Sequence, residues 1–291
     1  MMKGLTQSAL TEVNKIYATA KKEKNDAQVI KSLLYKMELQ EQKEEDAEIK
    51  NIRELEKETN VTAQPARSIL NSILATQYFS YLSRNRYQLY NRTKTINFKK
   101  EDIATWDIED LHRKISSLYM ESISNEKLLQ ETRLEKFDPI IIKGNARYLR
   151  PTLFDLLGHR ALEYFKNDER YLKKPAYSFE INSAEAFAEA KRFATYRFIT
   201  IDSFSLQHKA LQLFQRLIEF HLHDQGPGAL IDVDIERLRF VNSYGVMENK
   251  DTLFLRALEN LATNYPNQKE TDEVWYRLHY CMKLEVLNTI H

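Results

Sequence analysis

The chain holds few residues whose type and spacing could support chemistry, and two histidines come nearest to a metal-binding pattern. His221 and His223 stand two positions apart and are followed by Asp224. On a helix, residues at this spacing point about 200° apart and cannot share a metal ion. The apolar stripe from Leu211 to Ile218 predicts a helix at this place. We therefore expect these histidines to occupy the last turn of a helix, where positive charge suits the helix dipole, and to bind no metal.

Nucleophiles and phosphate-binding loops give no stronger signal. Cys281 is the single cysteine, and His279, two positions away, would face elsewhere on a helix. A thiol on an apolar stripe keeps a high pKa and stays inert. The six glycines form neither a dinucleotide or P-loop fingerprint nor a nucleophile elbow. The acidic run from Glu41 to Glu48 is typical of a solvated helix start. We expect a chain that is not an enzyme and has no cofactor.

The most suggestive polar segment is 84–100, which holds six basic residues, no acidic residue and three interleaved aromatic rings. Single-stranded nucleic acids bind to such surfaces by stacking bases on aromatic rings and pairing phosphates with Arg or Lys. The alternative is a long connection whose aromatic residues fix it to the core. We keep nucleic-acid binding as the alternative function and do not expect nucleic acid to be the partner. The candidate interaction surface consists of Arg84, Arg86, Tyr87, Tyr90, Arg92 and Lys94.

Composition excludes whole classes of protein. The 291 residues include 43 Lys and Arg against 42 Asp and Glu, so the net charge of +1 gives no bulk attraction to nucleic acid or anionic lipid. No stretch of 18 apolar residues occurs, so we expect no membrane insertion by this segment. The first residues, beginning Met1-Met2-Lys3, contain no apolar stretch that would serve as a signal peptide.

Glycine and proline placement predicts long helices. After Gly4 the next glycine is Gly144, and only Pro65 and Pro139 interrupt that interval. Apolar residues step by threes and fours in one set after another, as on amphipathic helices. Asn25-Asp26 fits a turn and N-cap, and Pro65 fits the first turn of a helix over about 64–85. The expected stripes are Leu5 to Ala20, Ile30 to Met37, Ile69 to Leu82, Leu153 to Phe165, Leu211 to Ile218, Ile231 to Val241, Leu258 to Tyr265 and, after a turn at Pro266-Asn267, Val274 to Cys281.

These elements predict an all-α fold built as an irregular tetratricopeptide-like array of antiparallel helix pairs, with a less regular middle segment. Residues 257–278 resemble a degenerate tetratricopeptide repeat, and we expect Trp275 to fill the groove between its two helices. The expected division is an N-terminal helical region, 1–170, with the basic connection 84–100, and a C-terminal helical-repeat region, 171–291. One continuous domain is the alternative.

Several strings taken together resemble the N-terminal helical region of large alpha-2-macroglobulin-like proteins of Bacteroidetes. The resemblance is clearest from 3 to about 180. The strings that carry it are KGLTQSALTEVNKIY at 3–17, LLYK at 33–36, YNRT at 90–93, TWD at 105–107, IKGN at 142–145, LRPTLFD at 149–155 and HRAL at 159–162.

The resemblance implies a piece of a longer envelope protein. Members of this family begin with a secretion signal, carry macroglobulin domains and often a thioester segment downstream, and are thought to trap proteases in the periplasm. This chain has no C-x-E-Q thioester string, so the trapping chemistry does not carry over. The resemblance implies a periplasmic or cell-envelope fragment that starts after the cleavage site. Its expected role is non-catalytic contact with downstream domains of its own longer chain or with another protein.

Overall fold

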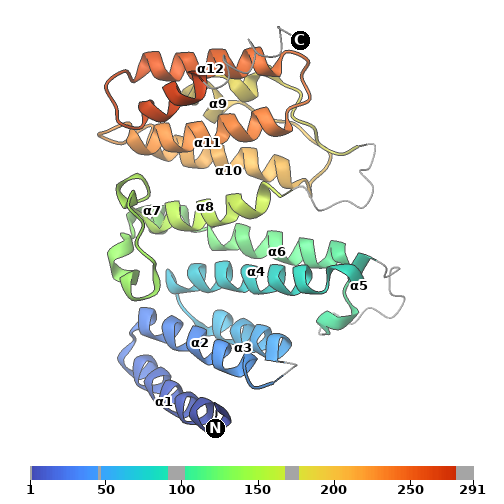
Figure 1. Ribbon diagram of the computed structural model, residues 1–291, viewed down its shortest axis with the longest axis vertical. Coiled ribbons are helices and arrows are strands. Elements are labelled where there is room, and N and C mark those ends of the chain that lie inside the picture. The colour runs from blue at the N-terminus through green and yellow to red at the C-terminus, as the bar shows by residue number, and fades with distance from the viewer. Residues whose placement is uncertain (1, 45–46, 91–101, 168–176, 280–291) are drawn as a thin grey trace. The chain divides into compact units, whose positions relative to one another are not determined.

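The protein is all-helical in the computed structural model, which describes residues 2–44, 47–90, 102–167 and 177–279 (Figure 1). These residues contain no strand and only two isolated β-bridges, so the predicted all-α class is confirmed. The α-helices are α1 (Met2–Glu23), α2 (Asp26–Glu41), α3 (Ala47–Val61), α4 (Ala66–Arg84), α5 (Arg86–Tyr90), α6 (Ile108–Ser122), α7 (Glu126–Glu131), α8 (Leu153–Phe165), α9 (Ala190–Thr195), α10 (Leu206–His221), α11 (Gly228–Tyr244) and α12 (Lys250–Asn264). Short 3₁₀ helices are η1 (Ile103–Thr105), η2 (Leu134–Ile140), η3 (Arg147–Leu149) and η4 (Ala184–Phe187), and residues 271–279 are also helical.

The chain forms two compact units that interleave along the sequence. Unit 1 comprises 1–147 and 151–161, and unit 2 comprises 148–150 and 162–291. Helix α8 therefore begins in unit 1 and ends in unit 2. The boundary predicted between 170 and 171 lies outside the described residues and stays a prediction.

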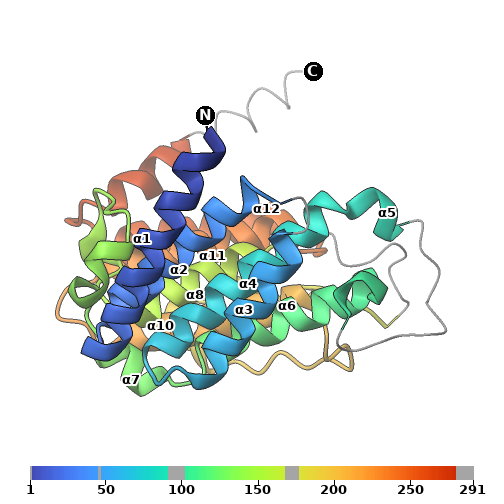
Figure 2. The ribbon, with the colours of Figure 1, turned by 90° about the horizontal axis from the view of Figure 1, so that it is seen from below.

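In unit 1, consecutive helices pack on one another: α1 on α2, α2 on α3, and α3 on α4 (Figure 2). Helix α4 also packs against α6, and its Leu70 and Ala75 are fully buried, as are Leu111 and Ile115 of α6. The side chain of Asn25 accepts a hydrogen bond from the N–H of Gln28 at 3.1 Å, which confirms the predicted N-cap of α2.

Two features of unit 1 differ from the sequence-based expectation. The apolar stripe of α1 is only partly covered, because Leu5 is 73% exposed and Ile16 is 44% exposed. Helix α6 lies in the middle segment, where no regular stripe was recognised. Asp107 begins this helix with a capping box, accepting a hydrogen bond from the N–H of Asp110 while its own N–H bonds the Asp110 carboxylate.

Unit 2 is built on a consecutive series in which α10 packs on α11 and α11 on α12 (Figure 1). The predicted stripes of α10 and α11 are buried, from Leu211 to Ile218 and from Ile231 to Val241. The segment around η4 and α9 covers the same helices and reaches α11 near its end. There the N–H of Val246 donates to the carbonyl of Ile181 at 3.0 Å. A side chain at Gly245 would place its Cβ 2.7 Å from the carbonyl oxygen of Val241, so this position requires glycine.

The expectation for Trp275 is wrong. Its side chain is 52% exposed, while Val274 and Leu278 in the same helical segment are 0% and 1% exposed. Trp275 is adjacent in sequence to the buried line at 274 and 278, and the helix turns it toward solvent. The smaller aliphatic residues fill the core there.

Candidate functional site

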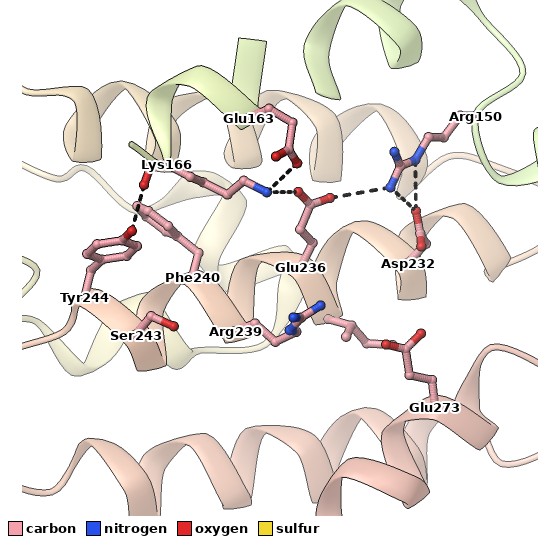
Figure 3. A pocket seen from close by; sticks show the side chains of 11 residues that line it. Arg150, Glu163, Lys166, Asp232, Glu236, Arg239, Phe240, Ser243, Tyr244 and Glu273 are labelled. Atoms are coloured by element: carbon pink, nitrogen blue, oxygen red, sulfur yellow. Dashed lines mark hydrogen bonds and ion pairs between the residues drawn. The ribbon is translucent and has the colours of Figure 1, made fainter. Parts of the chain in front are cut away.

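A charged pocket of about 490 Å³ lies in unit 2, along one face of α11 (Figure 3). Asp232, Glu236, Arg239 and Ser243 recur at intervals of three and four residues, so they form a single polar stripe. The opposite stripe of the same helix is the apolar one that was predicted, and it anchors α11 in the core. We call this cavity the α11 pocket. Its volume lies within the range of small-ligand sites.

An ion-pair network forms one wall of the α11 pocket. Arg150, just before α8, contacts Asp232 at 3.2 Å and Glu236 at 3.6 Å. Lys166, just after α8, contacts Glu236 at 2.8 Å and Glu163 at 2.7 Å. The hydroxyl of Tyr244 donates to the carbonyl of Lys166 at 2.8 Å and holds this residue in place. Glu236 thus forms ion pairs with both cations and is the centre of the network (Figure 3).

The protonation state of Lys166 limits what the network can do chemically. Burial lowers the pKa of Lys166, but its hydrogen bonds to Glu163 and Glu236 outweigh burial and raise the pKa above its ordinary value. The side chain is therefore an ammonium at neutral pH. An ammonium holds anionic groups and does not act as a nucleophile or a base. This arrangement suits the binding of a charged ligand.

Arg239 differs from the other cations of the α11 pocket. It is exposed, and no ion pair joins it to any residue that the structure describes (Figure 3). Glu273 lies across the pocket but pairs with Arg277 of its own helical segment. Arg239 thus offers a guanidinium with free donors beside a wall whose other two cations and three carboxylates are already joined in ion pairs. A guanidinium of this kind binds carboxylates and phosphates.

The predicted interaction surface is only partly described by the structure. Arg84 ends α4, is exposed, and contacts Glu41 at 3.9 Å and Glu48 at 3.4 Å. Glu41 and Glu48, the two ends of the acidic run that was expected to be solvated, therefore neutralise part of this surface. Arg86 and Tyr87 lie in α5 and are exposed, Tyr87 to 84%.

The remaining predicted residues do not form a described site. Tyr90 is the last residue of α5, and Arg92 and Lys94 lie outside the described residues. Cys281 also lies outside them. His221 occupies the last turn of α10, as predicted, and its Nδ1 lies 2.8 Å from the Asp224 carboxylate, whereas His223 lies beyond the end of the helix. Among the described residues, no group of three or more His, Cys, Asp or Glu side chains could hold a metal ion.

The sequence contained one signal for the α11 pocket that was missed. The spacing of Asp232, Glu236 and Arg239 marks a charged stripe on a helix whose apolar stripe was recognised. Its partners could not be found this way, because Arg150 and Lys166 lie some 70 to 80 positions earlier in the chain. Local periodicity gives the face of a helix and not the element that covers it.

The chain matches no protein-family model, no curated protein and no solved structure to a significant degree. Across the part of the chain that the structure describes, no helix is both long enough and apolar enough to span a membrane. The interpretation of the α11 pocket therefore depends on its own geometry.

Proposed function

We propose that this chain is a non-catalytic helical module that binds an acidic segment of a protein through the α11 pocket. The observation that carries the proposal is Arg239, an exposed guanidinium without an ion partner among the described residues, beside a wall whose two cations and three carboxylates are already joined in ion pairs. A carboxylate that enters the pocket can pair with Arg239 in the bidentate geometry that guanidinium groups favour.

The ion-pair network gives this interaction its selectivity. Arg150 and Lys166 are already paired with the carboxylates around them, so they hold the wall rigid and offer little further attraction. A cationic ligand would gain little from Glu236, because this carboxylate already pairs with Arg150 and Lys166. An anion can pair with Arg239 directly. Its binding costs little free energy of reorganisation, because the side chains of the wall are already held in place.

The finer fold that we propose is an irregular tetratricopeptide-like array. It is supported by the consecutive packing of α10, α11 and α12, since repeat arrays bury each helix pair chiefly against its neighbours. Such arrays present side chains of successive helices along one surface. The polar stripe of α11 would be part of such a surface.

The resemblance to alpha-2-macroglobulin-like proteins supplies the context of this proposal. A downstream domain of the same longer chain, or another envelope protein, would then provide the acidic segment. A role in a protease-trapping protein of the periplasm or cell envelope follows from the resemblance alone. Nucleic-acid binding through 84–100 stays the alternative, and the pairing of Arg84 with Glu41 and Glu48 weighs against it.

The test is fluorescence polarisation of the full chain with a labelled tetraglutamate peptide and its tetraglutamine counterpart. We expect only the tetraglutamate peptide to bind, with an affinity that falls as salt rises. The variant Arg239→Gln should weaken this binding about tenfold, which corresponds to about 1.4 kcal/mol.

The matched control is Arg256→Gln, which changes an exposed arginine of α12 outside the pocket. This variant should bind the tetraglutamate peptide like the unchanged protein. Equal binding of both peptides, or equal losses in the two variants, would show that the α11 pocket is not the acidic-segment site.

A further inference from the structure

A second cavity, of about 230 Å³, lies on another face of α11 in unit 2. Its floor is formed by α11, one side by the segment from Phe187 to Lys191, and the other side by α12. We call it the α11–α12 cavity. It has room for about seven water molecules at their volume in the liquid, which is enough for one side chain or a short stretch of main chain. It is too small for a helix, whose diameter is about 10–12 Å.

The floor of the α11–α12 cavity holds a buried ion pair. Asp234 is 3% exposed and Arg237 is 1% exposed, and Oδ1 of the aspartate lies 2.8 Å from Nε of the arginine. Neither of these two atoms makes a hydrogen bond of good geometry. Arg237 donates one hydrogen bond, from Nη1 to the carbonyl of Ala186 at 2.7 Å, and lies over the ring of Phe193.

Both charges of the pair lack part of the stabilisation that they would have in water. Burial raises the pKa of Asp234 more than the nearby Arg237 lowers it. Burial likewise lowers the pKa of Arg237, although Asp234 opposes this change. Buried polar groups in this condition gain from additional hydrogen-bond partners. Because Oδ1 and Nε face each other and are themselves covered, a ligand that supplies one donor and one acceptor would reach the pair through its other oxygen and nitrogen atoms.

The walls add polar groups without partners. Asn260 and Asn264 stand one turn apart on α12, line the cavity, and make no side-chain hydrogen bond to a described residue. Tyr265 lines the same cavity as Asp234 and Glu189, and burial, together with the charges of these two carboxylates, raises the pKa of its phenol. Leu222 and Leu261 complete the lining with apolar surface.

The charges around the α11–α12 cavity cancel. Asp234 and Arg237 balance on the floor, and Glu189 and Lys191 balance at the rim. A ligand with a net charge therefore gains no Coulomb attraction. A carboxamide places an N–H donor and a carbonyl acceptor side by side, which matches an aspartate beside an arginine, and asparagine amides extend the same pattern. We propose that this cavity binds the neutral side-chain carboxamide of a glutamine or asparagine residue of a peptide.

The test is a nuclear magnetic resonance titration of the full chain with N-acetylglutamine methylamide, using N-acetylglutamate methylamide as the charged counterpart. The glutamine compound should shift the side-chain amide signals of Asn260 and Asn264 with a dissociation constant of about 1 mM. This affinity should change less than twofold between low and high salt. The glutamate compound should bind at least fivefold more weakly.

Two variants at exposed positions test the cavity without disturbing the buried core, so a loss of binding would not be due to unfolding. Asn260→Ala and Asn264→Ala change exposed side chains and should each weaken binding at least threefold, whereas Asn267→Ala, outside the cavity, should not. Absence of saturable shifts at ten times the expected dissociation constant would overturn the proposal. So would equal binding of the two compounds. Arg239→Gln should leave this binding unchanged, so the result is separate from the test of the α11 pocket.

Discussion

Glu58 of α3 connects two helices of unit 1 by accepting hydrogen bonds from two side chains of α1. The hydroxyl of Tyr17 donates to Oε2 at 2.5 Å and the ammonium of Lys21 donates to the same oxygen at 2.8 Å. Burial raises the pKa of Glu58, but these hydrogen bonds outweigh burial, and the pKa lies below its ordinary value of 4.5. The ionised form is therefore the one that holds α1 against α3.

The first prediction concerns the acid stability of this contact. Because the pKa of Glu58 is lower in the folded protein, its contribution is fully present above pH 4.5 and is lost as the pH falls through the folded value. Glu58→Gln should lower the free energy of unfolding by about 1–3 kcal/mol at pH 7. The difference from the unchanged protein should shrink at pH 3. Urea unfolding at both pH values measures this.

Glu12→Gln is the comparison for this experiment, since Glu12 is exposed and its ion pair among the described residues is with Lys15 of its own helix. It should have little effect at either pH. A loss for Glu58→Gln that is equally large at pH 3 would show that packing, and not charge, is responsible.

At the scale of elements, the apolar spacing of the sequence predicted where most helices lie. Helix α4 was expected over about 64–85 and spans Ala66–Arg84, and the stripes of α8, α10 and α11 are buried as expected. Helix α6 was missed although its sequence carries both signals, a capping box at Asp107 and a buried apolar stripe with the helical spacing of Ile108, Leu111, Ile115 and Leu118.

Which helix faces meet could not be predicted, because periodicity fixes a face but not its partner. The stripe of α1 was recognised, yet Leu5 remains exposed. The α11 pocket could not be predicted for the same reason, since it depends on contacts such as that between Asp232 and Arg150, which are 82 residues apart in the sequence. The candidate surface at 84–100 was chosen for composition, which does not show that Glu41 and Glu48 would lie beside Arg84.

The second prediction tests which side chains of the helical segment 271–279 are buried in the core. Leu278→Ala should lower the free energy of unfolding by about 2–5 kcal/mol, because Leu278 is 1% exposed and its truncation leaves a cavity. Trp275→Ala should cost less than about 1 kcal/mol, since this side chain is 52% exposed. Chemical unfolding of both variants gives the comparison. A larger loss for Trp275→Ala would restore the original expectation that it fills a groove.

At the scale of the whole molecule, α8 belongs to both units, so no single cut separates them. Its first part supplies unit 1 with Arg160, which donates to the hydroxyls of Ser72 and Thr76 of α4, both at 2.9 Å. Any fragment meant to represent unit 1 must therefore contain this helix.

The third prediction compares two fragments, 1–147 and 1–165. The longer fragment should unfold in one cooperative thermal transition. The shorter one lacks Leu153, Phe154 and Leu157, which are at most 1% exposed in the whole chain, and should melt earlier and bind the dye ANS. Circular dichroism and dye fluorescence report the two effects. Identical melting of both fragments would show that α8 contributes nothing to unit 1.

The division of α8 also has a consequence for the chain as it leaves the ribosome. The last residues that unit 1 needs, 151–161, are made only after 148–150, which belong to unit 2. At roughly 5–20 residues per second, the stretch from 148 to 161 takes about one to three seconds to synthesise. During that interval the hydroxyls of Ser72 and Thr76 of α4 lack the hydrogen bonds that Arg160 donates in the folded protein. The nascent protein is thus open to chaperones and to misassociation for a time that one short stretch of sequence determines.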